Sequence, residues 1–290
     1  MKTDFSFLCA FLILALSNLS FQWPIENARL TSTYGESRAD HFHDGIDLIS
    51  NSSDAVYPLE QGRLVYLWDK ALFPEDNYPG GGNYKIIAHR GGFSVYMHLQ
   101  DGLSLKRDLP PKEALGYIGN TGHSFAKHLH VSIMDPKTRS SKNLLPYLPP
   151  YADLKSPEIG EMCLKIEDKY VIIRDRSTIR LTSHYPLLVK IIDSATGGEK
   201  LGIYSIRANF NGKQALSADF DGLVSSGKNI LASGRTFESL YDPEGYYKID
   251  GLTYRQGPND LEIIAADFAG NKTVKSFQFN VNLDMDKAGR

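Results

Sequence analysis

The segment His128–Ile133 has the sequence HLHVSI, in which polar and apolar residues alternate. Successive side chains on a β-strand point to opposite faces of the sheet, so residues two apart share a face. The apolar row comprises Leu129, Val131 and Ile133, and the polar row comprises His128, His130 and Ser132. The pattern therefore predicts a strand with one buried face and one face that carries two imidazoles.

A second segment, Phe93–Leu99, repeats this arrangement with the sequence FSVYMHL. Its apolar row comprises Val95, Met97 and Leu99, and opposite that row lie Ser94, Tyr96 and His98. Two strands thus offer a buried face and a face bearing histidine. A metal site or an acid–base site on a rigid sheet requires such a surface.

The remaining pattern predicts an all-β chain without an amphipathic helix of convincing length. Further strands are expected at Gly62–Trp68, Tyr84–His89 and Leu115–Ile118, and the turn Arg90-Gly91-Gly92 predicts a hairpin. The segment Asp69–Gly82 is expected to be a long loop of the kind that is often functional.

The C-terminal half has regular strands of a different character. Asn211-Gly212 is a strong hairpin signal, and alternating apolar residues flank the turn Asp267–Asn271. This regularity predicts a β-sandwich, which we interpret as an immunoglobulin-like accessory domain. A proline-rich passage at Leu144–Pro157 marks the expected boundary, so the predicted domains are residues 21–150, with a core at 28–136, and residues 151–290.

The composition excludes several classes of protein. The chain has 290 residues, 42% of them hydrophobic and 23% charged, which is typical of a globular protein rather than a disordered or fibrous one. The formal net charge of −2 gives no general electrostatic reason to bind nucleic acid or an acidic membrane, so neither partner is expected. Histidine is unevenly spread, because seven of the eight lie between His41 and His130.

The first 20 residues, Met1–Ser20, are typical of a secretory signal that is cleaved after Ser17 or Ser20. The alternative is a membrane anchor, but the apolar run Phe5–Leu16 is shorter than the roughly 20 residues that a span needs. We therefore expect export to the periplasm or the cell exterior, with no stable membrane span after cleavage. Cleavage removes Cys9, so the mature chain would have the single thiol Cys163 and no internal disulfide.

The segment His43-Asp44-Gly45-Ile46-Asp47 adds an imidazole and a carboxylate separated by four positions. The glycine between them would let the backbone bend sharply, so that both side chains reach one ion. A catalytic zinc takes three protein ligands and leaves a fourth position for water. His43, Asp47 and one histidine of the His128–His130 pair would satisfy that number, and the remaining imidazoles could move protons.

Three motifs in this order resemble the M23 family of zinc metallopeptidases, the lysostaphin/LytM-like peptidoglycan endopeptidases. They are TSTYGESRADHFHDGIDL at Thr31–Leu48, YMHL at 96–99 and GNTGHSFAKHLH at 119–130. The resemblance covers about Ala28–Ile133 and implies a mostly antiparallel β-sheet domain. It implies one Zn²⁺ per chain bound by His43, Asp47 and His130, with His98 and His128 as the catalytic pair.

The chain departs from the family pattern in two loops, at Phe125-Ala126 and at Asp108–Pro111. Neither departure touches a ligand position, although both affect loops that could shape the substrate groove. We expect an exported zinc-dependent metalloendopeptidase that hydrolyses peptide cross-links of bacterial peptidoglycan. The alternative is a non-catalytic family member that binds peptidoglycan or activates an amidase; such members lack ligands or catalytic histidines, whereas this chain retains all five.

Several other residues could attract attention. We expect His41 at the groove rim, and His89 and His123 without catalytic duty. Cys163 is expected to be a buried structural thiol. For Tyr34, Tyr96 and Arg38, a role in substrate binding and a role in packing are equally compatible with the sequence. The C-terminal half shows no cluster of residues that identifies its partner.

Overall fold

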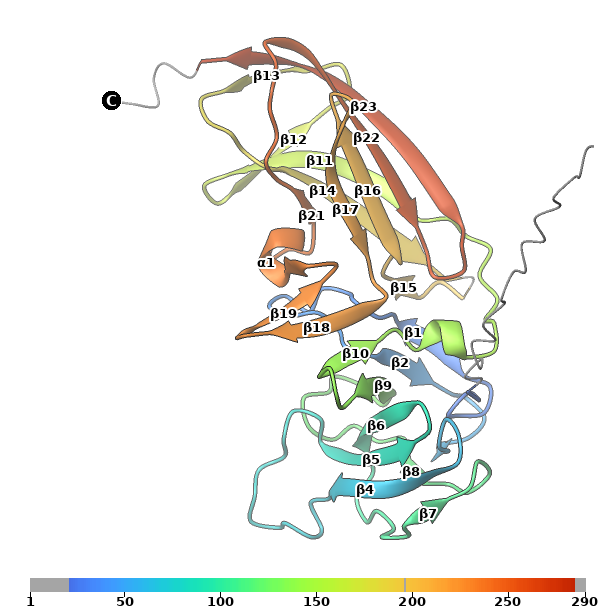
Figure 1. Cartoon of the computed structure of the whole chain (residues 1–290). Coiled ribbons are helices and arrows are strands. Elements are labelled where there is room, and N and C mark those ends of the chain that lie inside the picture. The colour runs from blue at the N-terminus through green and yellow to red at the C-terminus, as the bar shows by residue number, and fades with distance from the viewer. Residues whose placement is uncertain (1–20, 196, 285–290) are drawn as a thin grey trace, which may run out of the picture.

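The structure is a computed structural model that describes residues 21–195 and 197–284 (Figure 1). The predicted signal Met1–Ser20 lies outside the described residues. In the described part, the helical elements are the single-turn 3₁₀ helix η1 (Leu145–Tyr147) and the short helix α1 (Phe237–Leu240), so the prediction of an all-β chain is confirmed. No described helix is long and apolar enough to span a membrane.

The N-terminal half is built on an antiparallel sheet. Along it run β10 (Ser140–Lys142), β9 (Leu129–Asp135), β6 (Gly92–Leu99), β5 (Asn83–His89), β4 (Gly62–Trp68) and β7 (Asp108–Leu109). Strand β2 (Ile46–Ile49) pairs with the first part of β9 and with β1 (Arg29–Ser32), while β3 (Ala55–Val56) and β8 (Gly116–Tyr117) form a separate two-stranded sheet. One face of the main sheet covers a core that includes Ile46, Leu129 and Val131.

The C-terminal half is a sandwich of two sheets around one core (Figure 1). One sheet contains β12 (Lys169–Ile173), β11 (Glu158–Ile166), β14 (Leu187–Ser194), β15 (Lys200–Leu201) and β21 (Tyr247–Ile249). The other contains β13 (Thr178–Leu181), β23 (Lys272–Leu283), β22 (Gly257–Ala266), β16 (Ser205–Phe210) and β17 (Lys213–Asp219). The predicted hairpin at Asn211-Gly212 joins β16 and β17. The immunoglobulin-like assignment stays a prediction.

A hairpin from the C-terminal half extends the N-terminal sheet. It consists of β18 (Gly222–Ser226) and β19 (Asn229–Ala232), followed by β20 (Arg235–Thr236). Strand β18 pairs antiparallel with β10, and the resulting sheet has 11 strands. Because β10 would otherwise be an edge strand with unpaired backbone groups, this pairing covers an edge that is prone to aggregation.

Each half also contributes side chains to the core of the other. Tyr34 and Phe42, from the segment between β1 and β2, are buried in the core of the sandwich. In the opposite direction, Ala195 and Leu201 are buried in the core of the N-terminal half. The boundary near residue 150 stays a prediction, and the two halves are interlocked on both sides of it.

Most predicted strands in the N-terminal half are confirmed, but the face assignment within Phe93–Leu99 is wrong for the four residues 94–97. Ser94 pairs with Ile133 and Val95 with Ser132, the reverse of the predicted faces. Tyr96 pairs with Val131 and lies fully buried in the core, whereas Met97 pairs with His130 and shares its face. His98 has φ = 61°, a left-handed conformation that is uncommon for a residue other than glycine. This conformation interrupts the alternation at the end of β6, which explains how His98 and Tyr96 lie on different faces.

Candidate metal centre

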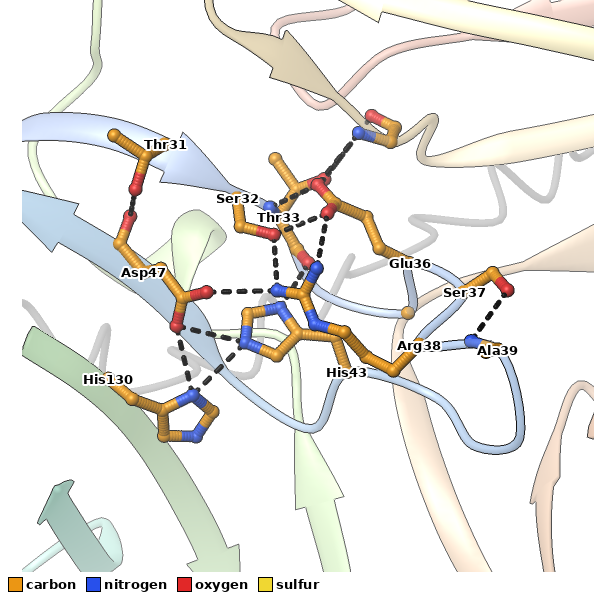
Figure 2. A network of polar contacts seen from close by, with 12 residues as sticks. Thr31, Ser32, Thr33, Glu36, Ser37, Arg38, Ala39, His43, Asp47 and His130 are labelled. Carbon is orange, nitrogen blue, oxygen red and sulfur yellow. Dashed lines mark hydrogen bonds and ion pairs between the residues drawn. The ribbon is translucent and has the colours of Figure 1, made fainter. Parts of the chain in front are cut away.

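Three side chains that sequence analysis singled out as metal ligands meet at one point (Figure 2). Asp47 on β2 lies directly opposite His130 on β9 in the strand pairing, and His43 comes from the loop just before β2. The atoms His43 Nε2, His130 Nδ1 and Asp47 Oδ1 form a triangle whose three sides are each 3.0 Å. Each offers a ligand atom, so the group could hold a metal ion.

Neighbouring groups determine which atoms face this point. The Nδ1–H of His43 donates a hydrogen bond of 2.7 Å to the carbonyl oxygen of Thr33, because a carbonyl can only accept. In the neutral ring this leaves a lone pair on Nε2, and that lone pair points at the carboxylate of Asp47 and the ring of His130. Lone pairs that converge at this distance repel one another unless a cation or a proton lies between them, so the donor set fits a metal.

Protonation of His130 and ionisation of Asp47 stabilise this group in the absence of metal. Burial acts to lower the pKa of His130, but hydrogen bonds and ion pairs with Asp44 and Asp47 outweigh it and raise the pKa to about 9. Burial acts to raise the pKa of Asp47, but hydrogen bonds and ion pairs with His130 and His43 outweigh it and hold the pKa well below its usual range. The metal-free site therefore keeps a proton that a metal must displace.

His98 and His128, the predicted catalytic pair, lie together beside the three candidate ligands. Their ring centroids are 4.8 Å apart, and the His98 ring is 6.2 Å from that of His130. The Nδ1–H of each donates a 2.8 Å hydrogen bond to a backbone carbonyl, Thr121 for His98 and Ala126 for His128. Nε2 is therefore the atom that each ring has available for proton transfer.

Burial, together with the neighbouring rings, keeps His98 neutral. It lowers the pKa of His98 to about 4, although the hydrogen bond to Thr121 acts in the opposite direction. A neutral ring with its proton on Nδ1 has a lone pair on Nε2 at pH 7, so it can accept a proton. The left-handed backbone of His98 belongs to the class of strained conformations that concentrate at functional sites.

The comparison with protein families agrees with this geometry. Residues 41–143 match the family model described as Peptidase family M23. They form an M23 peptidase domain. The resemblance predicted from the three motifs is thus confirmed, and the five residues named above all lie within the matched range. A second family model, which has no descriptive name, matches residues 156–282.

Solved structures of related proteins also match the chain. LytU is 22% identical over 42% of this chain and 86% of its own, with a TM-score of 0.34. A zinc-containing peptidase from Vibrio cholerae is 23% identical over 39% of this chain and 36% of its own, with a TM-score of 0.33. Lysostaphin from Staphylococcus simulans is 15% identical over 90% of this chain and 100% of its own, with a TM-score of 0.35. No curated protein matches the chain.

The backbone bends at Gly45, as predicted, but close packing is a second reason for a glycine there. Its φ angle does not lie in the left-handed region, so the bend alone does not require glycine. A Cβ atom at this position would lie 2.6 Å from His130 Nε2 and 2.6 Å from the carbonyl oxygen of Val131. Glycine is needed because the His130 ring passes close to the backbone.

The other residues considered in the sequence lie outside the metal group. His41 and His123 are exposed, and the Nδ1 atom of His89 contacts Glu60 at 2.9 Å. Tyr34 and Tyr96 are fully buried and therefore pack rather than line a groove. Cys163 is a buried free thiol, and burial raises its pKa to about 11, which agrees with a structural role.

Sequence analysis missed the contacts that surround Asp47. A guanidinium Nη2 of Arg38 donates to Asp47 Oδ2 at 2.9 Å and to Ser32 Oγ at 2.6 Å (Figure 2). Glu36 lies 3.4 Å from Arg38 and accepts a 2.9 Å hydrogen bond from the backbone N–H of Gly202. This chain of contacts joins the sandwich to Asp47, and no local sequence pattern indicates it.

Proposed function

We propose that this chain is an exported zinc-dependent metalloendopeptidase that hydrolyses peptide cross-links of bacterial peptidoglycan. The observation that carries the proposal is the convergence of three ligand atoms within 3.0 Å of one another, beside two imidazoles whose Nε2 atoms are available. Membership of residues 41–143 in a peptidase family supports the reaction class. The substrate class comes from the resemblance of the three motifs to peptidoglycan endopeptidases, and lysostaphin is described as an antimicrobial peptidase.

His43, Asp47 and His130 would hold the zinc ion through the three atoms that face one another. When bound, zinc lowers the pKa of a coordinated water to near 7 and polarises a carbonyl oxygen. His98 is neutral at pH 7 and would accept a proton from the attacking water at Nε2. Once protonated, it would deliver this proton to the leaving amine, while His128 Nε2 would orient the water or bind the oxyanion.

The alternative is a non-catalytic chain that binds peptidoglycan or activates an amidase. A non-catalytic role would not need the two histidines to be held with both Nε2 atoms available. The export component rests on the composition of Met1–Ser20 alone. Its test is the mass of the secreted or periplasmic protein, which should match a chain that begins after Ser17 or Ser20.

Digestion of purified sacculi tests the reaction. The chain from residue 21 onward, loaded with zinc, should convert cross-linked muropeptide dimers into products with new peptide ends, which mass spectrometry identifies. His98→Ala should retain zinc but lose at least about 100-fold in rate, within the range for a general acid–base group. His123→Ala, a change at an exposed histidine in a loop near the site, is the matched control and should stay active. Intact sacculi with zinc bound to the protein would indicate an autoinhibited enzyme or a different peptide substrate, whereas intact sacculi and a protein with no zinc affinity would favour the non-catalytic alternative.

A further inference from the structure

Three aspartates gather outside the M23 site, where the linker meets the sandwich. Asp153 lies on the linker, Asp193 on β14 and Asp267 at the start of the β22–β23 turn. One carboxylate oxygen from each lies within 4.8 Å of one from each of the others. We call these residues the carboxylate cluster. Their exposed fractions are 6%, 1% and 1%, so the cluster is buried.

Hydrogen bonds within the described residues satisfy only part of the carboxylate cluster. Asp267 accepts from the backbone N–H groups of Ala269 and Asn271 and from the side-chain amide of Asn271. Asp153 Oδ1 accepts from the backbone N–H of Lys155 at 3.1 Å, but its Oδ2 has no donor among these residues. Neither oxygen of Asp193 has a hydrogen-bond partner there. Three buried carboxylate oxygens are therefore left without donors, which is costly in a dry environment.

No nearby positive charge fully compensates the negative charge of the carboxylate cluster. Burial and the Asp267 carboxylate raise the pKa of Asp153, and Lys155 offsets this increase only in part. Burial raises the pKa of the Asp193 carboxyl to about 7, and the Asp267 and Asp153 carboxylates act in the same direction. The hydroxyl of Tyr151 is also buried without a partner among the described residues, and its pKa is raised by burial and by all three carboxylates.

We propose that the carboxylate cluster binds one calcium ion per chain. All available donors are oxygen atoms, which hard cations prefer, whereas zinc sites favour nitrogen and sulfur. The unpartnered oxygens of Asp153 and Asp193 supply ligands from two segments. A carboxylate oxygen of Asp267 and the hydroxyl of Tyr151 complete the set of oxygen donors. Calcium accepts six to eight oxygens in irregular geometry, while magnesium requires near-ideal octahedral geometry.

The position of the cluster indicates what the cation does. It ties the linker to both sheets of the sandwich at the end that meets the M23 domain, since Asp193 and Asp267 come from different sheets. Phe268, next to Asp267, packs against both cores, and Ala195, two residues after Asp193, is buried in the core of the N-terminal half. Calcium would therefore fix the junction between the two halves rather than take part in hydrolysis.

The test uses the chain from residue 21 onward, freed of calcium and kept saturated with zinc, so that loss of zinc cannot mimic the effect. Calorimetric titration with calcium chloride should give one site per chain. At about 100 times the dissociation constant, calcium should raise the midpoint of thermal unfolding by roughly 5–10 °C. Asp193→Asn should abolish both effects, while Asp168→Asn, at an exposed aspartate in the β11–β12 turn, should retain them.

The Asp193→Asn variant also distinguishes a bound calcium ion from a proton that the carboxyl groups of the cluster share. Without calcium, Asp193→Asn should unfold at a higher temperature than the wild type at pH 8, because a neutral amide removes the repulsion between carboxylates. With calcium the order should reverse. The proposal is overturned if the wild-type protein shows no saturable calcium binding at millimolar concentration. In that case a proton shared between the carboxylates, rather than a cation, would stabilise the cluster. Calcium binding that persists unchanged in Asp193→Asn would also overturn it, by locating the ion elsewhere.

Discussion

The two oxygens of the Asp47 carboxylate have separate partners. Oδ1 faces the two imidazoles, while Oδ2 accepts a hydrogen bond from Arg38. The arginine is itself held by Ser32 and lies near Glu36, so its position is fixed from two sides. Such outer contacts orient a ligand, and their loss typically weakens metal affinity 10- to 100-fold.

We therefore expect Arg38→Ala to weaken zinc affinity by roughly 10-fold or more while the protein stays folded. Asp47 would lose the partner that directs Oδ1 at the metal, and Glu36 would be left near a carboxylate of the same sign. A competition titration against a chromophoric chelator measures the change. Arg63→Ala, at an exposed position on β4, is the control and should bind zinc as the wild type does. Equal affinities for both variants would show that Arg38 does not position Asp47.

Zinc affinity should also depend on pH through His130. Its pKa of about 9 in the metal-free chain means that the ring carries a proton at pH 7, which zinc must displace. Apparent affinity should therefore rise by up to about tenfold per pH unit below pH 9 from this group alone. Because the folded-state pKa is raised, His130 stabilises the metal-free fold below its unfolded pKa of about 6.5, and this contribution is lost as pH rises through 9.

Titration calorimetry in buffers of different ionisation enthalpy measures this proton directly. About one proton should be released per zinc bound at pH 7. Asp44→Asn removes the carboxylate that lies 3.3 Å from His130 Nε2, so it should lower the pKa of His130 and reduce the number of protons released. A proton count that is the same in both proteins would contradict the role given to Asp44.

At the scale of elements, the alternation of apolar and polar residues predicted where the strands lie better than which side chains face the site. The strand Gly62–Trp68 has the bounds predicted from composition, and both predicted hairpin turns are present. The faces of β6 were wrong because the left-handed backbone of His98 is imposed by its neighbours and leaves no mark in the sequence pattern. The close packing at Gly45 was not predicted for a similar reason, since the approach of the His130 ring is a contact between distant segments.

The segment Thr33–Phe42 connects the site to the sandwich. Phe42, immediately before His43, is buried and packs edge-on against Phe237 with ring centroids 5.3 Å apart. Phe42→Ala should reduce the free energy of unfolding by about 3–5 kcal/mol, as for other buried phenylalanines. It should also weaken zinc binding, because it releases the segment that positions His43.

A second phenylalanine serves as the control that distinguishes the loss of stability from the loss of zinc binding. Phe210 is buried in the same core and packs against Tyr254, but it lies on β16, which pairs with β17 and β22 and not with β2 or β9. Phe210→Ala should cost a similar free energy of unfolding and leave zinc affinity unchanged. Denaturant unfolding and chelator competition on both variants provide the comparison. A loss of zinc affinity that simply followed stability in both proteins would remove the specific role of the Thr33–Phe42 segment.

At the scale of the whole molecule, the sequence predicted two β-rich halves but not their interlocking. The contacts between them join residues far apart in the chain, such as Gly35 with Tyr241 and Thr33 with Gly202. Periodicity and turn signals report on neighbours in sequence, so they carry no information about such pairs. The shared sheet through β10 and β18 is of the same kind.

This interlocking predicts that the chain unfolds as one unit and that the M23 domain depends on the sandwich. A fragment of residues 21–150 would expose Tyr34 and Phe42, leave the β10 edge unpaired and lose the Gly202 hydrogen bond to Glu36. Burying two aromatic side chains alone stabilises by about 1.5–3 kcal/mol each, a large share of a typical domain's stability. We expect one calorimetric transition for the whole chain, and for the fragment a lower midpoint, weaker zinc binding and self-association. Two separate transitions, with a fragment that matches the lower one and binds zinc as the whole chain does, would instead establish independent domains.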